Sequence, residues 1–135
     1  MTLIAKLNED LALEFQSIVQ YTQHVATIKG AEYKAIVEEI EGHLVQELEH
    51  AKILASQIDF LGGTPTVEVP EIPYAPDGEQ ALKTDLALEE EQLERYRKRV
   101  LQAIELGLPD VAEALRPLLQ QTQDHVADLR HALNE

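Results

Sequence analysis

Four long stretches of this chain place apolar residues at alternating steps of three and four, and this pattern constrains the fold most. In the first stretch one face runs through Leu7, Leu11, Glu14, Ile18, Tyr21, Val25 and Ile28. That spacing is typical of an α-helix that buries one face. Breaks at Gly and Pro residues predict helices over residues 3–29, 31–61, 78–106 and 109–134. Four such faces can bury one another, so we predict an all-α four-helix bundle.

The connections between the predicted helices differ in length. Gly30 and the run Gly107–Asp110 are short enough for antiparallel hairpins, whereas four of the 6 prolines fall between Gly62 and Gly78. A stretch with so many prolines is extended, so it can travel the length of the bundle as one long crossover. The 135 residues fit a single domain, residues 1–135. Pro117 lies inside the fourth predicted helix, where we expect it to kink or interrupt the helix.

Composition excludes several classes of protein. The chain has 11 Lys and Arg against 25 Asp and Glu, a formal net charge of -14, so it repels phosphate backbones and we expect no nucleic-acid partner. It has no Cys, which removes disulfides, thiolate metal sites and cysteine nucleophiles. No apolar run approaches the roughly 18 residues of a membrane span, and we expect no export signal. We therefore expect a cytoplasmic protein with no membrane partner.

Polar residues interrupt every apolar face near its middle. They are Glu14 in the first helix, Glu47 and His50 in the second, Glu89 in the third, and Thr122 and His125 in the fourth. Carboxylates buried together repel one another unless something positive lies between them. Glu47 and His50 are three residues apart, which sets their side chains next to each other on the helix. Carboxylate oxygens with imidazole nitrogens suit iron or manganese, and zinc is also compatible.

The order of these residues matches that of di-iron bundles, in which two helices each give a lone Glu and two give Glu-x-x-His. Local motifs add to this match: Leu13-Glu14 with Gln20-Tyr21, Glu47-Leu-Glu-His50 followed by Phe60–Pro65, and Asp85-Leu-Ala-Leu-Glu89. On these residues the chain resembles the bacterioferritin branch of the ferritin-like superfamily over nearly its whole length. The resemblance implies a ferritin-like bundle in which Glu14 and His50 hold one iron, Glu89 and His125 hold the other, and Glu47 bridges them.

The activity implied by the resemblance is oxidation of Fe(II) by O2 or H2O2, for iron detoxification or storage. Glu47 and Tyr21 are the candidate catalytic residues. Tyr21 and Tyr96 have a second interpretation, as core aromatics whose hydroxyls reach a buried carboxylate. Glu47 and His50 likewise have a simpler interpretation, as a solvated Glu and a hydrogen-bonded core His.

Three features depart from the family pattern. Thr122-Gln-Asp-His125 stands where the family has a second Glu-x-x-His, so one bridging carboxylate is missing and we expect one tight and one weak metal position. Gln121 or Asp128 can approach the site only if Pro117 rotates the segment. Leu48 occupies the position of the haem-ligating Met, so we expect no haem. The chain ends at Glu135 without the fifth helix of cage ferritins, which argues against storage in a full cage.

The remaining histidines are ambiguous from sequence. His43 lies one turn from Glu47, where it can support the site, line an access path or be an ordinary buried His. His24 and His131 fall off the apolar faces, so we expect them at the surface. Asp128 and His131 repeat a metal-like spacing but are expected to face away from the core.

Two functional hypotheses follow from the sequence. The first is an iron oxidase acting on Fe(II) with O2 or H2O2. The second is a degenerate helical module that binds one metal or none and acts through protein interaction, and Thr122 is the feature that favours it. We expect a homodimer formed through Leu44, Val45 and Leu48, with a larger hollow assembly as the alternative.

Overall fold

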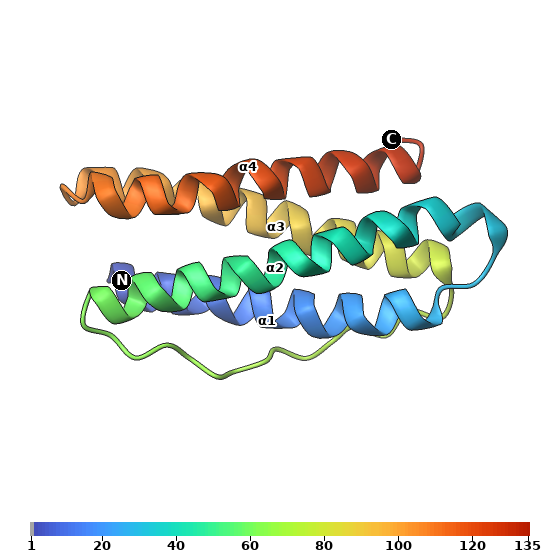
Figure 1. The fold of residues 1–135 in the computed structure, drawn as a ribbon, viewed down its shortest axis with the longest axis horizontal. Helices are drawn as coiled ribbons and strands as arrows, with labels where there is room; N and C mark the ends of the chain where they lie inside the picture. The colour runs from blue at the N-terminus through green and yellow to red at the C-terminus, as the bar shows by residue number, and fades with distance from the viewer. Residues whose placement is uncertain (1) are drawn as a thin grey trace.

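The computed structural model describes residues 2–135, and within them it contains helices and no strands. The elements are α1 (Leu3–Thr27), the short 3-10 helix η1 (Ala31–Tyr33), α2 (Lys34–Phe60), α3 (Gly78–Glu105) and α4 (Pro109–Ala132). The four long helices lie side by side, with α1–α2 and α3–α4 as hairpins (Figure 1). Each helix packs against two neighbours, in the cyclic order α1, α2, α4, α3. The predicted all-α four-helix bundle is confirmed.

Local sequence explains where the helices begin and end. Thr2 caps α1 by accepting a hydrogen bond from the Ala5 amide, and Asp77 caps α3 by accepting one from the Gln80 amide. α3 ends at a turn in which Gly107 takes a φ of 74°, a left-handed value that favours glycine. Pro109 then opens α4. α2 begins three residues later than predicted, because residues 31–33 form the 3-10 turn instead.

The crossover between α2 and α3, residues 61–77, runs along the outside of α1 for most of the bundle's length (Figure 1). The side chain of Asn8 in α1 holds the first part of this crossover through two hydrogen bonds. The Asn8 amide donates to the Thr64 carbonyl at 3.1 Å, and its Oδ1 accepts from the Thr66 amide at 2.8 Å. The predicted long crossover is therefore present, and because it returns along the bundle it places α3 parallel to α2 and antiparallel to α1 (Figure 1).

Pro117 does not interrupt α4. The helix runs continuously from Pro109 to Ala132, so the expected interruption is wrong. Proline removes one hydrogen bond from the helix, while its neighbours Leu115 and Leu118 are both fully buried in the core. Packing of these side chains holds the helix together across the lost bond. None of the helices in residues 2–135 is long and apolar enough to cross a membrane.

The second half of the bundle repeats the first with an offset of 75 residues. Glu14 and Glu89 are 75 positions apart (89 − 14), and the same offset relates Tyr21 to Tyr96 and His50 to His125. Two apolar clusters divide the core, one containing Leu7, Leu54, Ile58, Leu115 and Leu118 and the other containing Ile40, Leu82, Leu86, Val126 and Leu129. The polar residues of the four faces lie in a layer between these clusters.

Candidate metal centre

The five predicted ligand residues meet in this polar layer. Glu14, Glu47 and Glu89 are fully buried, and His50 and His125 are each 1% exposed. They form two groups whose ligand atoms lie within 4.8 Å of one another, Glu14–Glu47–His50 and Glu47–Glu89–His125. Glu47 belongs to both groups. The geometry therefore gives Glu47 the shared place that a bridging carboxylate would take.

The distances in both groups suit a small cation. His50 Nδ1 lies 3.5 Å from Glu14 Oε1 and 3.6 Å from Glu47 Oε2. His125 Nδ1 lies 2.9 Å from Glu47 Oε1 and 3.3 Å from Glu89 Oε1. Ligands held at about 2.0–2.2 Å from one ion are roughly 3 to 3.5 Å from each other. Both groups can thus hold an ion with small adjustments of their side chains.

Several polar atoms of the layer are buried without a hydrogen-bond partner. They are Glu14 Oε2, Glu47 Oε2, Glu89 Oε2 and His50 Nδ1. A buried polar atom left unpaired costs free energy, and a carboxylate oxygen costs more than a neutral group. Three of the four belong to the Glu14–Glu47–His50 group. In the other group His125 Nδ1 already pairs with Glu47 Oε1.

Two glutamines fix the orientation of the histidines. Gln121 Oε1 of α4 lies 2.7 Å from His50 Nε2, and Gln46 Oε1 of α2 lies 2.5 Å from His125 Nε2. An amide oxygen only accepts, so each Nε2 carries a proton, and Nδ1 is the ring nitrogen that faces the carboxylates and would bind an ion. The apolar periodicity does not indicate Gln46, and it suggests Gln121 only as a replacement ligand. Their shared place, directly before Glu47 and Thr122, is the signal that could have revealed them.

The two tyrosines brace the two unshared carboxylates. The Tyr21 hydroxyl donates to Glu89 Oε1 at 2.6 Å, and the Tyr96 hydroxyl donates to Glu14 Oε1. Burial, followed by the charges of nearby carboxylates, raises the pKa of both hydroxyls well above the usual value, so they remain donors. The interpretation of both as core aromatics that reach a carboxylate is confirmed.

Burial and neighbouring charges shift the pKa values of Glu47, His50 and Glu89 in this layer. Burial, followed by the charges of Glu14 and Glu89, raises the pKa of Glu47 well above its usual range. Burial alone would lower the pKa of His50, but its contact with Glu14 outweighs this and raises it. For Glu89, burial is outweighed by His125, whose hydrogen bond and charge lower its pKa. A metal ion bound here must therefore displace protons.

Thr122 occupies the position in α4 that corresponds to Glu47 in α2, and it is 1% exposed. No other acid replaces a carboxylate there, since Asp124 is exposed and Asp128 bonds to His43. Gln121 is committed to His50. The layer therefore contains three carboxylates, fewer negative charges than the four positive charges of two divalent ions.

A buried cluster of polar side chains lies one helical turn before Glu14 and another before Glu89, the two carboxylates that belong to a single ligand group. Behind Glu14, Asp10 accepts hydrogen bonds from Arg95 Nε at 2.6 Å and Arg99 Nε at 2.7 Å. Behind Glu89, Asp85 pairs with Gln20 and His24, whose Nδ1 lies 2.8 Å from Asp85 Oδ1. Burial raises the pKa of Asp85, although the contact with His24 opposes that shift. These residues lie too far along their helices to belong to the two ligand groups.

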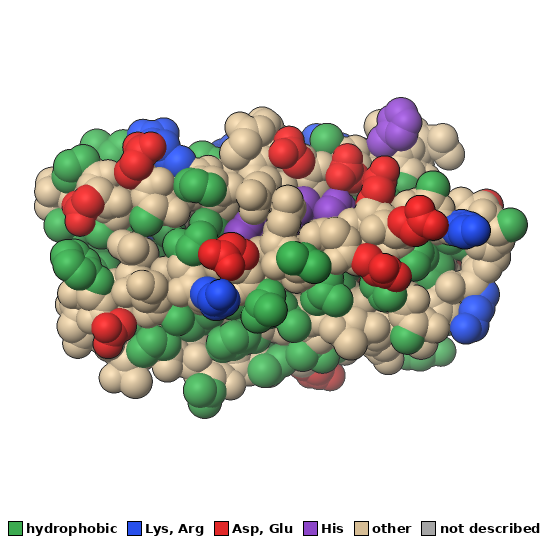
Figure 2. Space-filling view, viewed as in Figure 1, with side chains coloured by type: hydrophobic (Ala, Val, Ile, Leu, Met, Phe, Trp, Pro, Cys, Tyr) green, Lys and Arg blue, Asp and Glu red, His purple; other side chains and the backbone are tan. Residues whose placement is uncertain are grey.

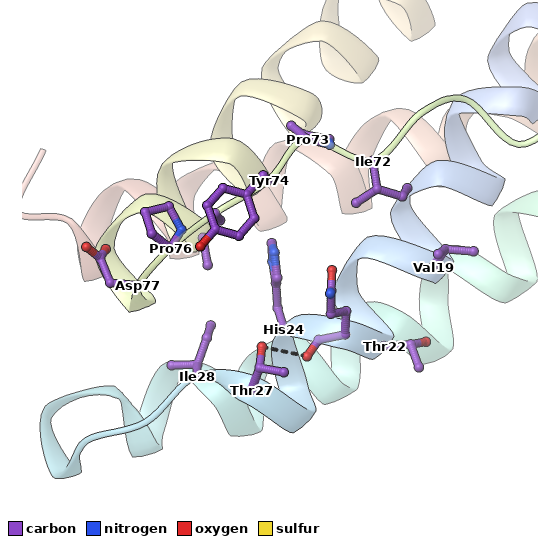
Figure 3. Close-up of a pocket in the computed structure, with 13 residues that line it drawn as sticks. Val19, Thr22, His24, Thr27, Ile28, Ile72, Pro73, Tyr74, Pro76 and Asp77 are labelled. Carbon is purple, nitrogen blue, oxygen red and sulfur yellow. Dashed lines mark hydrogen bonds between the residues drawn. The ribbon is translucent and has the colours of Figure 1, made fainter.

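His24 is 3% exposed, so its expected place at the surface is wrong. α1 packs against α2 and α3 together, and the arc it buries is therefore wider than one apolar stripe. The side chain stands between α1 and the crossover beside a cavity of about 800 Å³ (Figure 3). Ile72, Tyr74 and Pro76 cover this cavity from the crossover side. The cavity is separate from the two ligand groups.

His43 lies next to the second ligand group. Its ring stacks on that of His125 with centroids 4.0 Å apart and an interplanar angle of 20°. Its Nε2 lies 2.9 Å from Asp128 Oδ2, so Asp128 faces His43 rather than turning away as expected. Burial and the neighbouring His125 lower the pKa of His43. His131 is exposed, as predicted.

Comparison with known proteins agrees with this geometry. A family model described as the ferritin-like domain matches residues 4–135. No curated protein matches the chain. Among solved structures, the chain is similar to one described as a crystal structure of ferritin-like, diiron-carboxylate proteins from Bacillus anthracis strain Ames. That similarity has a TM-score of 0.92 and 32% identity, covering 98% of this chain and 99% of the other. The chain belongs to the ferritin-like domain family.

Proposed function

We propose that the chain binds Fe(II) in the polar layer and oxidises it with O2 or H2O2. The observation that carries the proposal is the pair of buried ligand groups that share Glu47 and contain carboxylate oxygens and a His50 Nδ1 without hydrogen-bond partners. Oxygen and imidazole ligands together suit iron or manganese, and zinc less specifically. The similar protein described as diiron-carboxylate supports iron over the other metals.

The two positions differ in how ready they are to bind. Glu14, Glu47 and His50 each present an unpaired atom, so an ion entering this group removes three unfavourable burials. An ion entering the second group must first break the 2.9 Å contact between His125 Nδ1 and Glu47 Oε1. Once the first ion draws charge from Glu47, the second position is also short of negative charge because Thr122 supplies none. The Glu14–Glu47–His50 group is the tighter position.

Oxidation at this site is a transfer of electrons from substrate iron to the oxidant. Two Fe(II) ions give two electrons, which with two protons convert O2 to H2O2 or H2O2 to two waters. Carboxylate ligands favour Fe(III) over Fe(II), so the three glutamates make the oxidation more favourable. Glu47 contacts both positions and releases its proton on binding, which gives it the central role. Tyr21 acts on Glu89 by holding that carboxylate in place.

Anaerobic titration of metal-free protein with Fe(II), followed by calorimetry, tests binding. Addition of O2 or H2O2, followed by absorbance of the Fe(III) product, tests oxidation. Glu47→Gln should lose both, while Glu49→Gln, an exposed acid on the same helix, should behave as the wild type. Absence of binding in the wild type would contradict the proposal and favour a helical interaction module.

We also propose that the chain forms a homodimer through the outer face of α2. Val45 is 70% exposed and Leu48 is 55% exposed, unusual values for large apolar side chains on one helix face. Apolar side chains gather over α1 and α2 on the visible side of the molecule (Figure 2). Sedimentation of the wild type and of Leu48→Glu tests this: a dimer should become a monomer, and a much larger particle would indicate a hollow assembly.

A further inference from the structure

An acidic hollow lies at the end of the bundle where η1 and the end of α4 meet. It has a volume of about 470 Å³, and its lining includes the acids Glu32, Glu39, Glu79 and Asp128, together with His131. Carboxylates gathered in a concave surface create a negative potential that concentrates cations. The net charge of -14 adds to this attraction. The hollow by itself accounts for a higher local concentration of cations, but not for a binding site.

The inner wall of the hollow leads to a buried histidine. Asp128 Oδ2 lies 2.9 Å from His43 Nε2, and the two residues come from different helices, α4 and α2. The Asp128 side chain is 43% exposed, whereas the His43 side chain is 6% exposed. His43 Nδ1 is buried with no hydrogen-bond partner. Such an atom is costly to bury, and it stays unpaired because the contact of the ring with Asp128 uses the other nitrogen, Nε2.

His43 connects the hollow to the candidate metal centre. Its ring stacks on His125 at a centroid distance of 4.0 Å, and His125 Nδ1 contacts Glu47 and Glu89. In the space-filling view, histidine side chains are visible in the gap between α2 and α4, with acidic side chains beside them (Figure 2). A continuous series of ligand-type groups therefore runs from the surface to the second ligand group.

We propose that Asp128 and His43 form a transient binding site for a divalent cation, through which ions pass from the acidic hollow to Glu89 and His125. Their separation of 2.9 Å is that of neighbouring ligands on one octahedral ion, roughly 3 Å for bonds of about 2.1 Å. Two protein ligands, with water completing the shell, bind weakly and release the ion readily. This inference rests on the proposed function, because the centre is the destination of the ion.

Co(II) is a suitable probe, because its absorbance changes when protein ligands replace water and no oxidation is needed. Mixing metal-free protein with Co(II) in a stopped-flow instrument gives the loading rate, and titration gives the final stoichiometry. Asp128→Asn and His43→Gln should each slow loading by about tenfold at low salt. The final stoichiometry should not change. Asp124→Asn, an exposed acid one turn earlier on α4, should load as the wild type does.

The outcomes separate this inference from the proposed function. If the wild type takes up Co(II) and Asp128→Asn loads as fast as Asp124→Asn, the route is wrong while the centre stands. A lower final stoichiometry in Asp128→Asn would also overturn the route, because it would make the residue part of the centre's permanent structure. If the wild type takes up no Co(II), the proposed function itself fails.

Discussion

The two halves of the bundle share four of the five residue pairs that face the candidate metal centre, and they also differ in the positions behind it. The shared pairs, all 75 residues apart, are Glu14 and Glu89, Tyr21 and Tyr96, Gln46 and Gln121, and His50 and His125. At the same offset, Arg95 and Arg99 in α3 correspond to Gln20 and His24 in α1. Both sets hold a buried aspartate, Asp10 or Asp85. The geometry around the centre is preserved, while the charge that supports it is not.

This difference changes which side chains stabilise the buried aspartate of each half. Arg99 is always charged, so the pair with Asp10 is a fixed buried ion pair. Asp85 contacts His24 and the uncharged amide of Gln20 instead, so no guanidinium supports it. The layer itself differs at one place, where Thr122 stands opposite Glu47. The α1–α2 half therefore contains both Asp10, which pairs with Arg99, and Glu47, the carboxylate that α4 lacks.

The largest expected effect comes from breaking the two aspartate clusters separately. Asp10→Asn leaves Arg99 buried without its partner and should lower the free energy of unfolding by about 3–5 kcal/mol. Asp85→Asn should cost about 1–3 kcal/mol, because it disturbs the hydrogen bonds of Gln20 and His24 but leaves no guanidinium buried without a partner. Urea denaturation of the two variants measures the difference. Equal losses would mean that the fixed charge of the arginines has no special weight.

Thr122→Glu makes the two halves alike at the one ligand position where they differ. In the metal-free protein a fourth buried carboxylate should lower the free energy of unfolding by about 3 kcal/mol, since it has no positive partner. With Fe(II) present the loss should be reversed, and two ions of similar affinity should bind per chain. Thermal denaturation with and without metal, together with calorimetry, tests both parts. Thr122→Val, which adds no charge, is the control.

Glu47→Gln removes the residue that the two ligand groups share. A saturating metal at 100 times its Kd should stabilise the wild type by about 2.7 kcal/mol and leave this variant unchanged. The sign of the pH effect follows from the raised pKa of Glu47. A group with a raised pKa in the folded state contributes stability below its unfolded pKa and loses it as the pH rises through the folded value.

Metal-free wild type should therefore become less stable than Glu47→Gln as the pH rises above the ordinary carboxyl range. The pKa of His50 is also raised. The folded protein therefore loses further stability as the pH rises above 6.5, the ordinary value of a histidine. Melting curves from acid to mildly alkaline pH measure the crossing. A constant difference between the two proteins would show that Glu47 does not hold a proton in the metal-free fold.

The smallest expected effect concerns the two tyrosines. Tyr21→Phe and Tyr96→Phe each remove one hydrogen bond to a buried carboxylate, and each should cost about 1.5–2 kcal/mol. Tyr96→Phe should weaken the tighter metal position and Tyr21→Phe the weaker one. Fe(II) affinity of each variant, measured anaerobically, distinguishes them. The same change in both positions from either variant would contradict the division into two groups.

The sequence predicted the bundle, its crossover and the meeting of five ligand residues, because each depends on spacing within a single helix. Gln46 and the partners of Asp85 were missed, since their contacts cross between helices and leave no periodic signal. His24 was misplaced because α1 buries two sides. Pro117 was overestimated as a breaker, because local propensity does not include the packing of its neighbours.

Diffraction at the iron absorption edge, from crystals loaded anaerobically with one and then two equivalents of Fe(II) per chain, would locate each bound ion. We predict an anomalous peak among Glu14, Glu47 and His50 at one equivalent. At two equivalents a weaker peak should follow among Glu47, Glu89 and His125. A first peak in the second group, equal peaks from the start, or iron bound away from Glu47 would contradict it.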